Sequence, residues 1–239
     1  MSMDKKIFMA RVADQAERYE DMVKYLKEIM NESEGDVSVD VRNLLSVGFK
    51  NLIGSRRAAW RTVSAIEQNK KYEQYSDNCK EYKSKIEIEL AELCEDIIKA
   101  VQDFSLSKCG DNSESKTFYL KMIGDYYRYI AECVQGDKLT EVTDKANDFY
   151  NQATEEAEKL PTYNSTRLGL ALNYSVFHYE LKNDSKKACE LAQHALDGAK
   201  QDIESMDNED ARDAISIVEL LKENLDLWKE AEGEGNDDE

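Results

Sequence analysis

The scarcity of proline restricts this chain to helical architectures. Pro161 is the single proline among 239 residues, and the chain contains only ten glycines. These two residues are the most costly in a helix interior, by about 3 and 1 kcal/mol relative to alanine. No stretch has the composition of a flexible or proline-rich linker. The sequence therefore predicts an all-α fold without separate, loosely joined domains.

Hydrophobic spacing predicts where the helices lie. Apolar residues recur every three to four positions in nine segments, which is the pattern of a helix with one buried face. Short runs of Asn, Asp, Gly and Ser separate the segments. The predicted helices cover residues 4–17, 20–32, 39–68, 72–104, 114–135, 138–159, 165–181, 185–203 and 209–229. Residues 230–239 are Gly, Asn and acids with one alanine and almost nothing to bury, which predicts a disordered tail.

The charge balance excludes several classes of partner. The chain has 50 acidic and 32 basic residues, a formal net charge of −18. A surface of this sign repels nucleic acid and anionic membranes, so neither is an expected partner. No apolar run approaches the roughly 20 residues that cross a bilayer, and no secretory leader follows Met1. We expect a soluble, intracellular protein in the cytoplasm, with the nucleus as a second location.

The residues that usually support catalysis or metal binding are few. His178 and His194 are the two histidines, and neither belongs to a helical metal-binding pattern. No glycine-rich phosphate loop or nucleophile elbow occurs. The five cysteines lack the paired spacing of a zinc site and are expected to be reduced thiols. We therefore expect no enzyme, no metal and no cofactor.

An acid-free segment in this acidic chain indicates a binding site. Residues 41–66 include five bases and no Asp or Glu. At about 100° per residue, Lys50, Arg57 and Arg61 lie within about 40° of one another on a helix. An ordinary solvated face is the alternative, and the missing acids weigh against it. The residues expected on the opposite, buried face are Leu45, Leu52, Ala59, Val63 and Ile66.

A second predicted helix carries both signs of charge on one stripe. Its charged residues are spaced by four, three and four positions: Lys121, Asp125, Arg128 and Glu132. Tyr129 lies beside them. The alternative interpretation is a ladder of ion pairs within one helix, each worth a few tenths of a kcal/mol. The residues expected in the core are Tyr119, Ile123, Tyr126, Ile130 and Val134.

Two later helices are apolar on both sides. The first has Leu168, Leu172, Val176 and Tyr179 on one face and Leu170, Tyr174, Phe177 and Leu181 on the other. The second has Ile217, Leu220 and Leu227 on one stripe and Ala214, Val218, Leu221 and Leu225 on another. A second apolar face either is buried in a larger stack or lines a binding groove. Asn173 and Asn224 border these stripes, and a carboxamide can hold the backbone of an extended peptide.

Several segments closely resemble the 14-3-3 family. They are RNLLSVGFKN (42–51), GSRRAAWR (54–61), FYLKMIGDYYRYIAE (118–132), RLGLALNYSVFHYE (167–180) and ELLKENLDLW (219–228), with QAERYEDM (15–22) and AIEQ (65–68) similar too. The likeness runs in family order from about Lys5 to Trp228. It implies nine antiparallel helices in a single domain over residues 1–229, with dimerisation and the groove floor in 1–104 and the groove wall in 114–229. It also implies a cup-shaped dimer whose amphipathic grooves bind phosphoserine or phosphothreonine segments of client proteins.

The resemblance assigns roles to individual residues. The phosphate would be held by Lys50, Arg57 and Arg128, with Tyr129 as the hydroxyl donor. The client backbone and groove would involve Lys121, Asn173, Glu180 and Asn224, and the apolar wall Leu172, Val176, Ile217, Leu220 and Leu227. Across the dimer contact, Arg18 would pair with Glu89 and Asp21 with Lys85. Two further residues are expected to support the site. Arg61 lies on the same helix face as Lys50 and Arg57. Asp125 is a carboxylate among crowded bases, which can orient them and reduce their repulsion.

Two departures from the family pattern are expected to matter. Ala58 and Ala59 stand where many members carry serines, so the phosphorylation that weakens dimers through this segment should not occur. Ser216 replaces an apolar residue of the groove wall. We therefore expect an adaptor that binds phosphorylated clients and itself, as a homodimer or a mixed dimer. The alternative is a phosphate-independent helical scaffold whose basic stripe only adds solubility.

Overall fold

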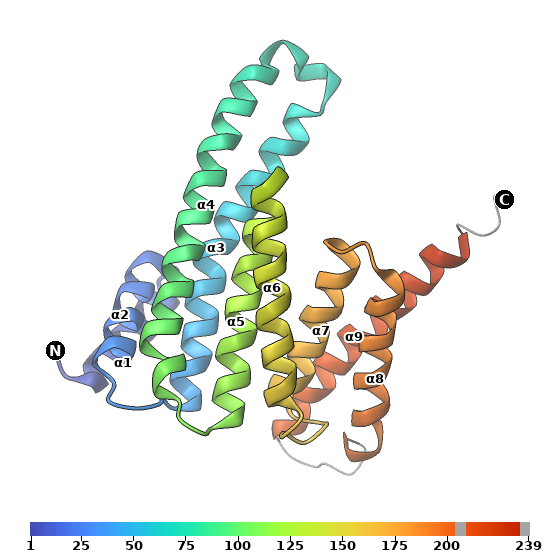
Figure 1. Cartoon of the computed structure of the whole chain (residues 1–239). Helices are drawn as coiled ribbons and strands as arrows, with labels where there is room; N and C mark the ends of the chain where they lie inside the picture. Colours follow the sequence, from blue (N-terminus) through green and yellow to red (C-terminus); the bar gives the residue numbers. More distant parts are fainter. Residues whose placement is uncertain (204–208, 235–239) are drawn as a thin grey trace. The chain divides into compact units, whose positions relative to one another are not determined.

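The computed structural model describes residues 1–203 and 209–234, and over these ranges the chain is all-α, as predicted. The described ranges contain nine α-helices, two 3-10 helices and no strand (Figure 1). In this part of the chain no helix is both long and apolar enough to cross a bilayer. The helices are α1 (Met3–Gln15), α2 (Tyr19–Glu32), α3 (Val39–Glu67), η1 (Lys70–Tyr75), α4 (Ser76–Phe104), η2 (Leu106–Lys108), α5 (Ser113–Ala131), α6 (Gly136–Ala157), α7 (Ser165–Glu180), α8 (Ser185–Ile203) and α9 (Glu209–Glu234).

Most predicted helix ends agree with the structure to within a few residues, and two differ for local reasons. Helix α5 ends at Ala131 rather than near residue 135. The N–H of Cys133 donates to a carbonyl only three residues back, and the chain then turns through Gly136 at a φ of 60°. Helix α9 continues to Glu234, so the predicted disorder is wrong for residues 230–234, where Glu and Ala favour a helix. Residues 235–239 lie outside the described ranges.

Polar side chains fix where three helices begin. Ser38, Asn164 and Asp184 each accept a hydrogen bond from the N–H three residues further on, at 3.4, 3.1 and 2.9 Å. Each bond satisfies one of the four N–H groups that a helix start leaves without a partner. These caps set the first residues of α3, α7 and α8, and with them the direction in which later side chains point.

The first compact unit comprises residues 1–111 and 126–144. Within it α3 and α4 run side by side, and α1 pairs with α2 (Figure 1). Gly48 allows α2 to approach α3, because a Cβ at this position would lie 2.8 Å from Leu26 and 3.1 Å from Met22. The largest fully buried side chains of α2, α3 and α4 are Met22, Leu26, Ile29, Met30, Leu45, Phe49, Ile53, Leu90 and Ile97.

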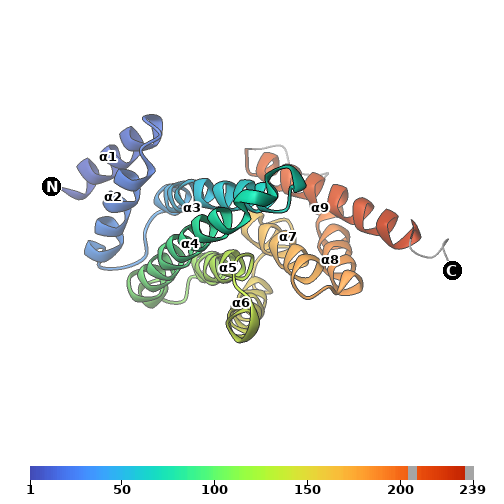
Figure 2. The same cartoon turned by 90° about the horizontal axis from the view of Figure 1, so that it is seen from above.

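The second compact unit comprises residues 112–125 and the described part of 145–239. Helix α8 packs against both α7 and α9 (Figures 1 and 2). Gly124 of α5 leaves room for Tyr150 of α6, since a Cβ there would lie 3.0 Å from its ring. The buried cluster consists of Leu168, Ala188, Ala192, Leu196, Ala199, Ala214, Leu221, Leu225 and Trp228. Helices α5 and α6 contribute to both units.

Candidate functional site

Helix α3 carries the predicted cationic face in the first unit. Arg57 is half-buried, whereas Lys50 and Arg61 are exposed. Lys50 lies about two turns before Arg57, and no residue in the described ranges forms a hydrogen bond or ion pair with it. Arg56 takes a different direction, because its Nη1 donates to Glu20 Oε1 at 3.0 Å. The acid-free segment therefore supplies three cations to one face and a fourth to another.

The opposite face of α3 is buried over only part of its length. Leu45, Leu52 and Val63 are buried, as predicted. Ala59 and Ile66 are exposed, so the prediction is wrong for these two residues. Residues spaced by seven drift about 20° around an α-helix with each repeat. The stripe that contains Leu52 has therefore rotated away from the core by the time it reaches Ile66.

Glu132, the residue after the end of α5, contacts several cations of this face. Arg57 donates to it in a bidentate manner, from Nε to Oε2 at 2.9 Å and from Nη2 to Oε1 at 2.5 Å. Arg61 Nη2 lies 3.4 Å and Arg128 Nη1 lies 3.8 Å from the same carboxylate. Glu132 is outside the predicted set of site residues. Three guanidinium groups thus lie within 4 Å of one carboxylate.

The ring of Tyr129 holds two of these guanidinium groups. Arg57 Cζ lies 4.0 Å and Arg128 Cζ lies 4.7 Å from the ring centroid. A cation within about 6 Å of an aromatic centroid is attracted to the face of the ring. Tyr126 packs edge-on against Tyr129, with centroids 5.6 Å apart. Arg128 is only 7% exposed, and the ring contact together with the bidentate bond to Glu132 holds the guanidinium group of Arg57.

Both i,i+4 pairs of the charged stripe, Lys121 with Asp125 and Arg128 with Glu132, lie within 4 Å. Lys121 Nζ lies 2.8 Å from Asp125, as a ladder requires. Further along, Glu132 contacts Arg57 of α3 more closely than it contacts Arg128. The second pair of the ladder is therefore shared with α3 and is not satisfied within one helix alone. The predicted core face is confirmed for Tyr119, Ile123, Tyr126 and Ile130, whereas Val134 follows the helix and is half-buried.

Asp125 organises polar groups of the second unit. It is 7% exposed and accepts a hydrogen bond from Tyr150 Oη at 2.6 Å. Asn173 Nδ2 donates to both of its oxygens, at 2.8 and 2.9 Å, and Lys121 Nζ donates at 2.8 Å. Asp125 was predicted to orient the bases of the site, and Lys121 is one base with which it pairs. Sequence reasoning missed Tyr150, the single tyrosine of α6, because nothing in the local pattern indicates that its hydroxyl reaches α5.

The apolar stripes of α7 and α9 are buried to different degrees. Leu170, Tyr174 and Phe177 of α7 are buried. The predicted wall residues Leu172, Val176 and Ile217 are half-buried and pack on the cluster of the second unit. Leu220 and Leu227 of α9 remain 48% and 62% exposed. Of the polar residues on these helices, Asn224 is half-buried, and Glu180 and Ser216 are exposed.

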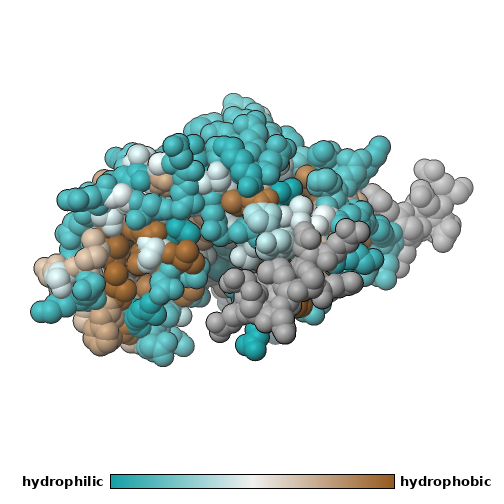
Figure 3. Space-filling view, turned by 90° about the horizontal axis from the view of Figure 1, so that it is seen from below, coloured by the Kyte–Doolittle hydropathy of each residue, from teal (hydrophilic) through white to brown (hydrophobic). Residues whose placement is uncertain are grey.

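The residues assigned to the dimer contact pair with near neighbours in the sequence in this single chain. Arg18 donates to Asp21, and Lys85 lies 4.0 Å from Glu89. Arg18, Lys85 and Glu89 are exposed. Apolar residues are exposed in the same unit, among them Phe8, Val12, Tyr82 and Ile88. Figure 3 shows apolar surface on the side where Figure 1 places α1 and α2.

Two thiols of the first unit, those of Cys94 and Cys133, are buried. Burial raises the pKa of Cys94 well above its usual range and that of Cys133 to about 12, so both stay protonated at neutral pH. Among the described residues, no group of three or more His, Cys, Asp or Glu could hold a metal ion.

The fold and the cationic cluster define an all-helical, anion-binding protein. A phosphate ester carries about −1.5 to −2 charges at neutral pH, and guanidinium groups bind its oxygens through charge-assisted hydrogen bonds. Residues 9–229 match the model of the 14-3-3 protein family, and the chain belongs to this family.

Similar proteins occur in distant organisms. The chain is 44% identical to 14-3-3 protein 2 of Entamoeba histolytica, over 95% of this chain and 96% of that protein. It is 44% identical to the 14-3-3 protein homolog of Trichoderma harzianum, over 98% and 90%. It is 42% identical to the 14-3-3-like protein GF14-F of Oryza sativa, over 100% and 93%.

Family membership decides between the two functions that the sequence left open. The chain is an adaptor that binds client proteins in a phosphorylation-dependent manner. A phosphate-independent scaffold is not favoured. Proteins of this family are adaptors rather than enzymes.

Proposed function

We propose that Lys50, Arg57, Arg128 and Tyr129 hold the phosphate of a phosphoserine or phosphothreonine client. The observation that supports this most is the pair of guanidinium groups fixed on one tyrosine ring. Glu132 occupies only the Nε–Nη2 edge of Arg57. The remaining N–H groups of Arg57 can donate to phosphate oxygens, because a guanidinium has five N–H donors in all.

In the second unit, Lys121, Asn173, Glu180 and Asn224 are proposed to bind the client backbone. Both carboxylate oxygens of Asp125 accept hydrogen bonds from the amide nitrogen of Asn173, so the orientation of this carboxamide is fixed. Its oxygen can then accept a hydrogen bond from a client N–H. Client side chains would contact the apolar wall, which consists of Leu172, Val176, Ile217, Leu220 and Leu227.

A matched pair of peptides tests the phosphate site. We expect the wild-type chain to bind a phosphoserine peptide at least about a hundredfold more tightly than its serine twin, since several charge-assisted bonds are lost together. Lys50→Glu and Arg57→Ala should abolish this preference with helical content unchanged by circular dichroism. Arg56→Ala is the control, because Arg56 pairs with Glu20 away from the cluster. Equal binding of both peptides by the wild type would overturn the proposal.

We also propose self-association, as a homodimer or a mixed dimer, through Arg18, Asp21, Lys85 and Glu89. Three of these residues are exposed, and the first unit exposes apolar residues on both α1 and α4. Burying such residues against a second copy would remove them from water and so favour association. Family membership further suggests the cytoplasm as the main location, the nucleus as a second one, and no catalytic activity.

A further inference from the structure

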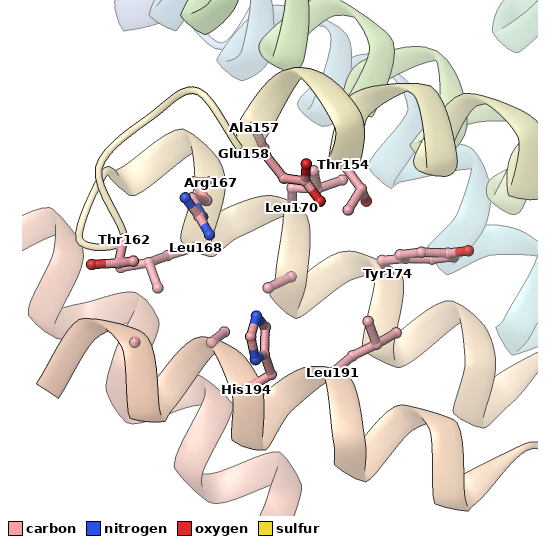
Figure 4. A pocket seen from close by; sticks show the side chains of 13 residues that line it. Thr154, Ala157, Glu158, Thr162, Arg167, Leu168, Leu170, Tyr174, Leu191 and His194 are labelled. Atoms are coloured by element: carbon pink, nitrogen blue, oxygen red, sulfur yellow. The ribbon is translucent and has the colours of Figure 1, made fainter.

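A cavity in the second unit lies apart from the residues proposed to bind phosphopeptides. It measures about 210 Å³ and is bounded by the end of α6, the connection to α7, and the helices α7 and α8 (Figure 4). None of the residues assigned above to the phosphate, the client backbone or the apolar wall lines it. The cavity therefore shares no lining residue with the proposed client site.

The walls of this cavity suit an apolar group. Leu170, Leu191 and Ala195 line it together with the ring of Tyr174. The Tyr174 hydroxyl is already bonded to two asparagines of α6, at 3.0 and 2.7 Å, so the residue offers the cavity only its ring. The volume equals that of roughly seven water molecules at about 30 Å³ each. Each water needs two to four polar partners, and the apolar walls offer few, so the cavity suits an apolar group better than water. Apolar cavities of about 150 Å³ are known to take a benzene-sized ligand.

Two opposite charges line the same cavity without pairing with each other. Arg167 Nη1 donates to the carbonyl oxygen of Leu160 at 2.6 Å, which fixes the guanidinium group. No carboxylate in the described ranges pairs with Arg167, and no described base pairs with Glu158. Figure 4 shows both side chains on one side of the cavity and His194 projecting toward it from α8. A ligand with one charge would satisfy only one of the two residues.

We propose that the cavity binds a free α-amino acid with an apolar side chain of the size of leucine or phenylalanine. The carboxylate of the ligand would bind Arg167, with His194 as a further polar contact, and its ammonium group would bind Glu158. The side chain would fill the space between Leu170 and Leu191. Such a ligand carries a carboxylate and an ammonium group on the same carbon atom, so it can pair with both charged residues and adds no net charge to the site. A fatty acid would place a second carboxylate near Glu158, and an amine would leave Arg167 without an anion.

Calorimetric titration of the full chain with L-phenylalanine and L-leucine tests the proposal. The comparison ligands are 3-phenylpropanoate, which lacks the ammonium group, 2-phenylethylamine, which lacks the carboxylate, and glycine, which lacks the side chain. We expect each loss to weaken binding about tenfold or more, as removal of one partner of a charge-assisted bond does. Equal affinity for 3-phenylpropanoate or 2-phenylethylamine would overturn the assignment of a zwitterion.

Variants place the binding in this cavity. Glu158→Gln should weaken L-phenylalanine binding about tenfold. Glu155→Gln, an exposed acid of α6 that does not line the cavity, should leave it unchanged. Ala195→Leu should abolish binding by filling the space. All three variants should bind the phosphoserine peptide like the wild type, which reports folding and keeps this inference distinct from the proposed phosphate site. No binding at about 10 mM ligand, tenfold above a dissociation constant of about 1 mM, or full binding by Ala195→Leu would refute the proposal.

Discussion

Glu132 controls how the cationic cluster is arranged at the level of single residues. Its two oxygens occupy one edge of Arg57, and both Arg61 and Arg128 lie within 4 Å of it. Three guanidinium groups this close repel one another, and a shared carboxylate offsets the repulsion. Glu132 therefore acts as a positioning residue for Arg57, whose other edge remains directed away from it.

Replacing Glu132 with Gln should weaken phosphopeptide binding about tenfold. A carboxamide has one acceptor oxygen, and its NH₂ group would face a donor of Arg57. The bidentate contact would then be lost, and Arg57 would no longer be held for the phosphate. Fluorescence polarisation with a labelled phosphoserine peptide measures the change.

Glu20→Gln is the control for this substitution, because Glu20 pairs with Arg56 outside the cluster. Its affinity should match that of the wild type. Tighter binding by Glu132→Gln would show that the carboxylate competes with phosphate more than it positions Arg57, which would contradict the argument.

At the level of helices, the sequence predicts which face of a helix is buried better than it predicts which other helix that face contacts. Apolar spacing places Tyr119 and Ile123 in the core because helical periodicity is a local property. The same spacing fails for Ile66, since a seven-residue repeat drifts about 20° around the helix with each heptad and so leaves the buried face. The contact of Arg57 with Glu132 joins residues 75 positions apart. No local sequence pattern indicates a contact between residues this far apart. The contact between α3 and α5 was predicted only from the resemblance to a family.

Helix α7 contains a buried histidine that should make the protein sensitive to mild acid. His178 is 9% exposed, and neither ring nitrogen has a hydrogen-bond partner in the described part of the chain. Burial lowers its pKa from the ordinary value of 6.5, the charges of Lys187 and Lys182 lower it further, and Asp184 opposes them. The folded chain therefore favours the neutral form of the His178 ring.

The free energy of unfolding should fall as the pH drops below 6.5, by at most about 1.4 kcal/mol per pH unit from this group. Above pH 6.5 both folded and unfolded chains hold a neutral ring, so the contribution is constant. Below it the unfolded chain binds a proton that the folded chain resists. Urea denaturation at pH 7.5 and 5.5 measures the difference. His178→Phe should reduce the slope, whereas His194→Gln, at an exposed position, should not; equal slopes in all three proteins would contradict the prediction.

For the whole molecule, the balance between charge and exposed apolar surface determines association. A net charge of −18 favours separate chains in low salt, because like-charged molecules repel. Exposed Phe8 and Val12 of α1 favour burial against a partner. Specific pairs of opposite charge are then needed to select one mode of association over others.

A charge swap tests whether Asp21 and Lys85 pair between copies. Lys85→Glu should weaken self-association at least about tenfold, because it places two acids opposite each other. The double variant Asp21→Lys with Lys85→Glu should restore association by reversing the pair. Sedimentation equilibrium measures both. Lys80→Glu is the control, since Lys80 is exposed and pairs with Asp77 of its own helix; failure of the double variant to recover would count against this contact.

The carboxylate that already lies against Arg57 has a consequence for how clients can be imitated in experiments. A client in which aspartate or glutamate replaces the modified serine brings one negative charge and two oxygens. Glu132 already offers Arg57 that same group, at high local concentration and without the entropy cost of association. Acidic mimics of phosphorylation should therefore gain little from this cluster, and a client mutated in this way should behave as an unmodified one.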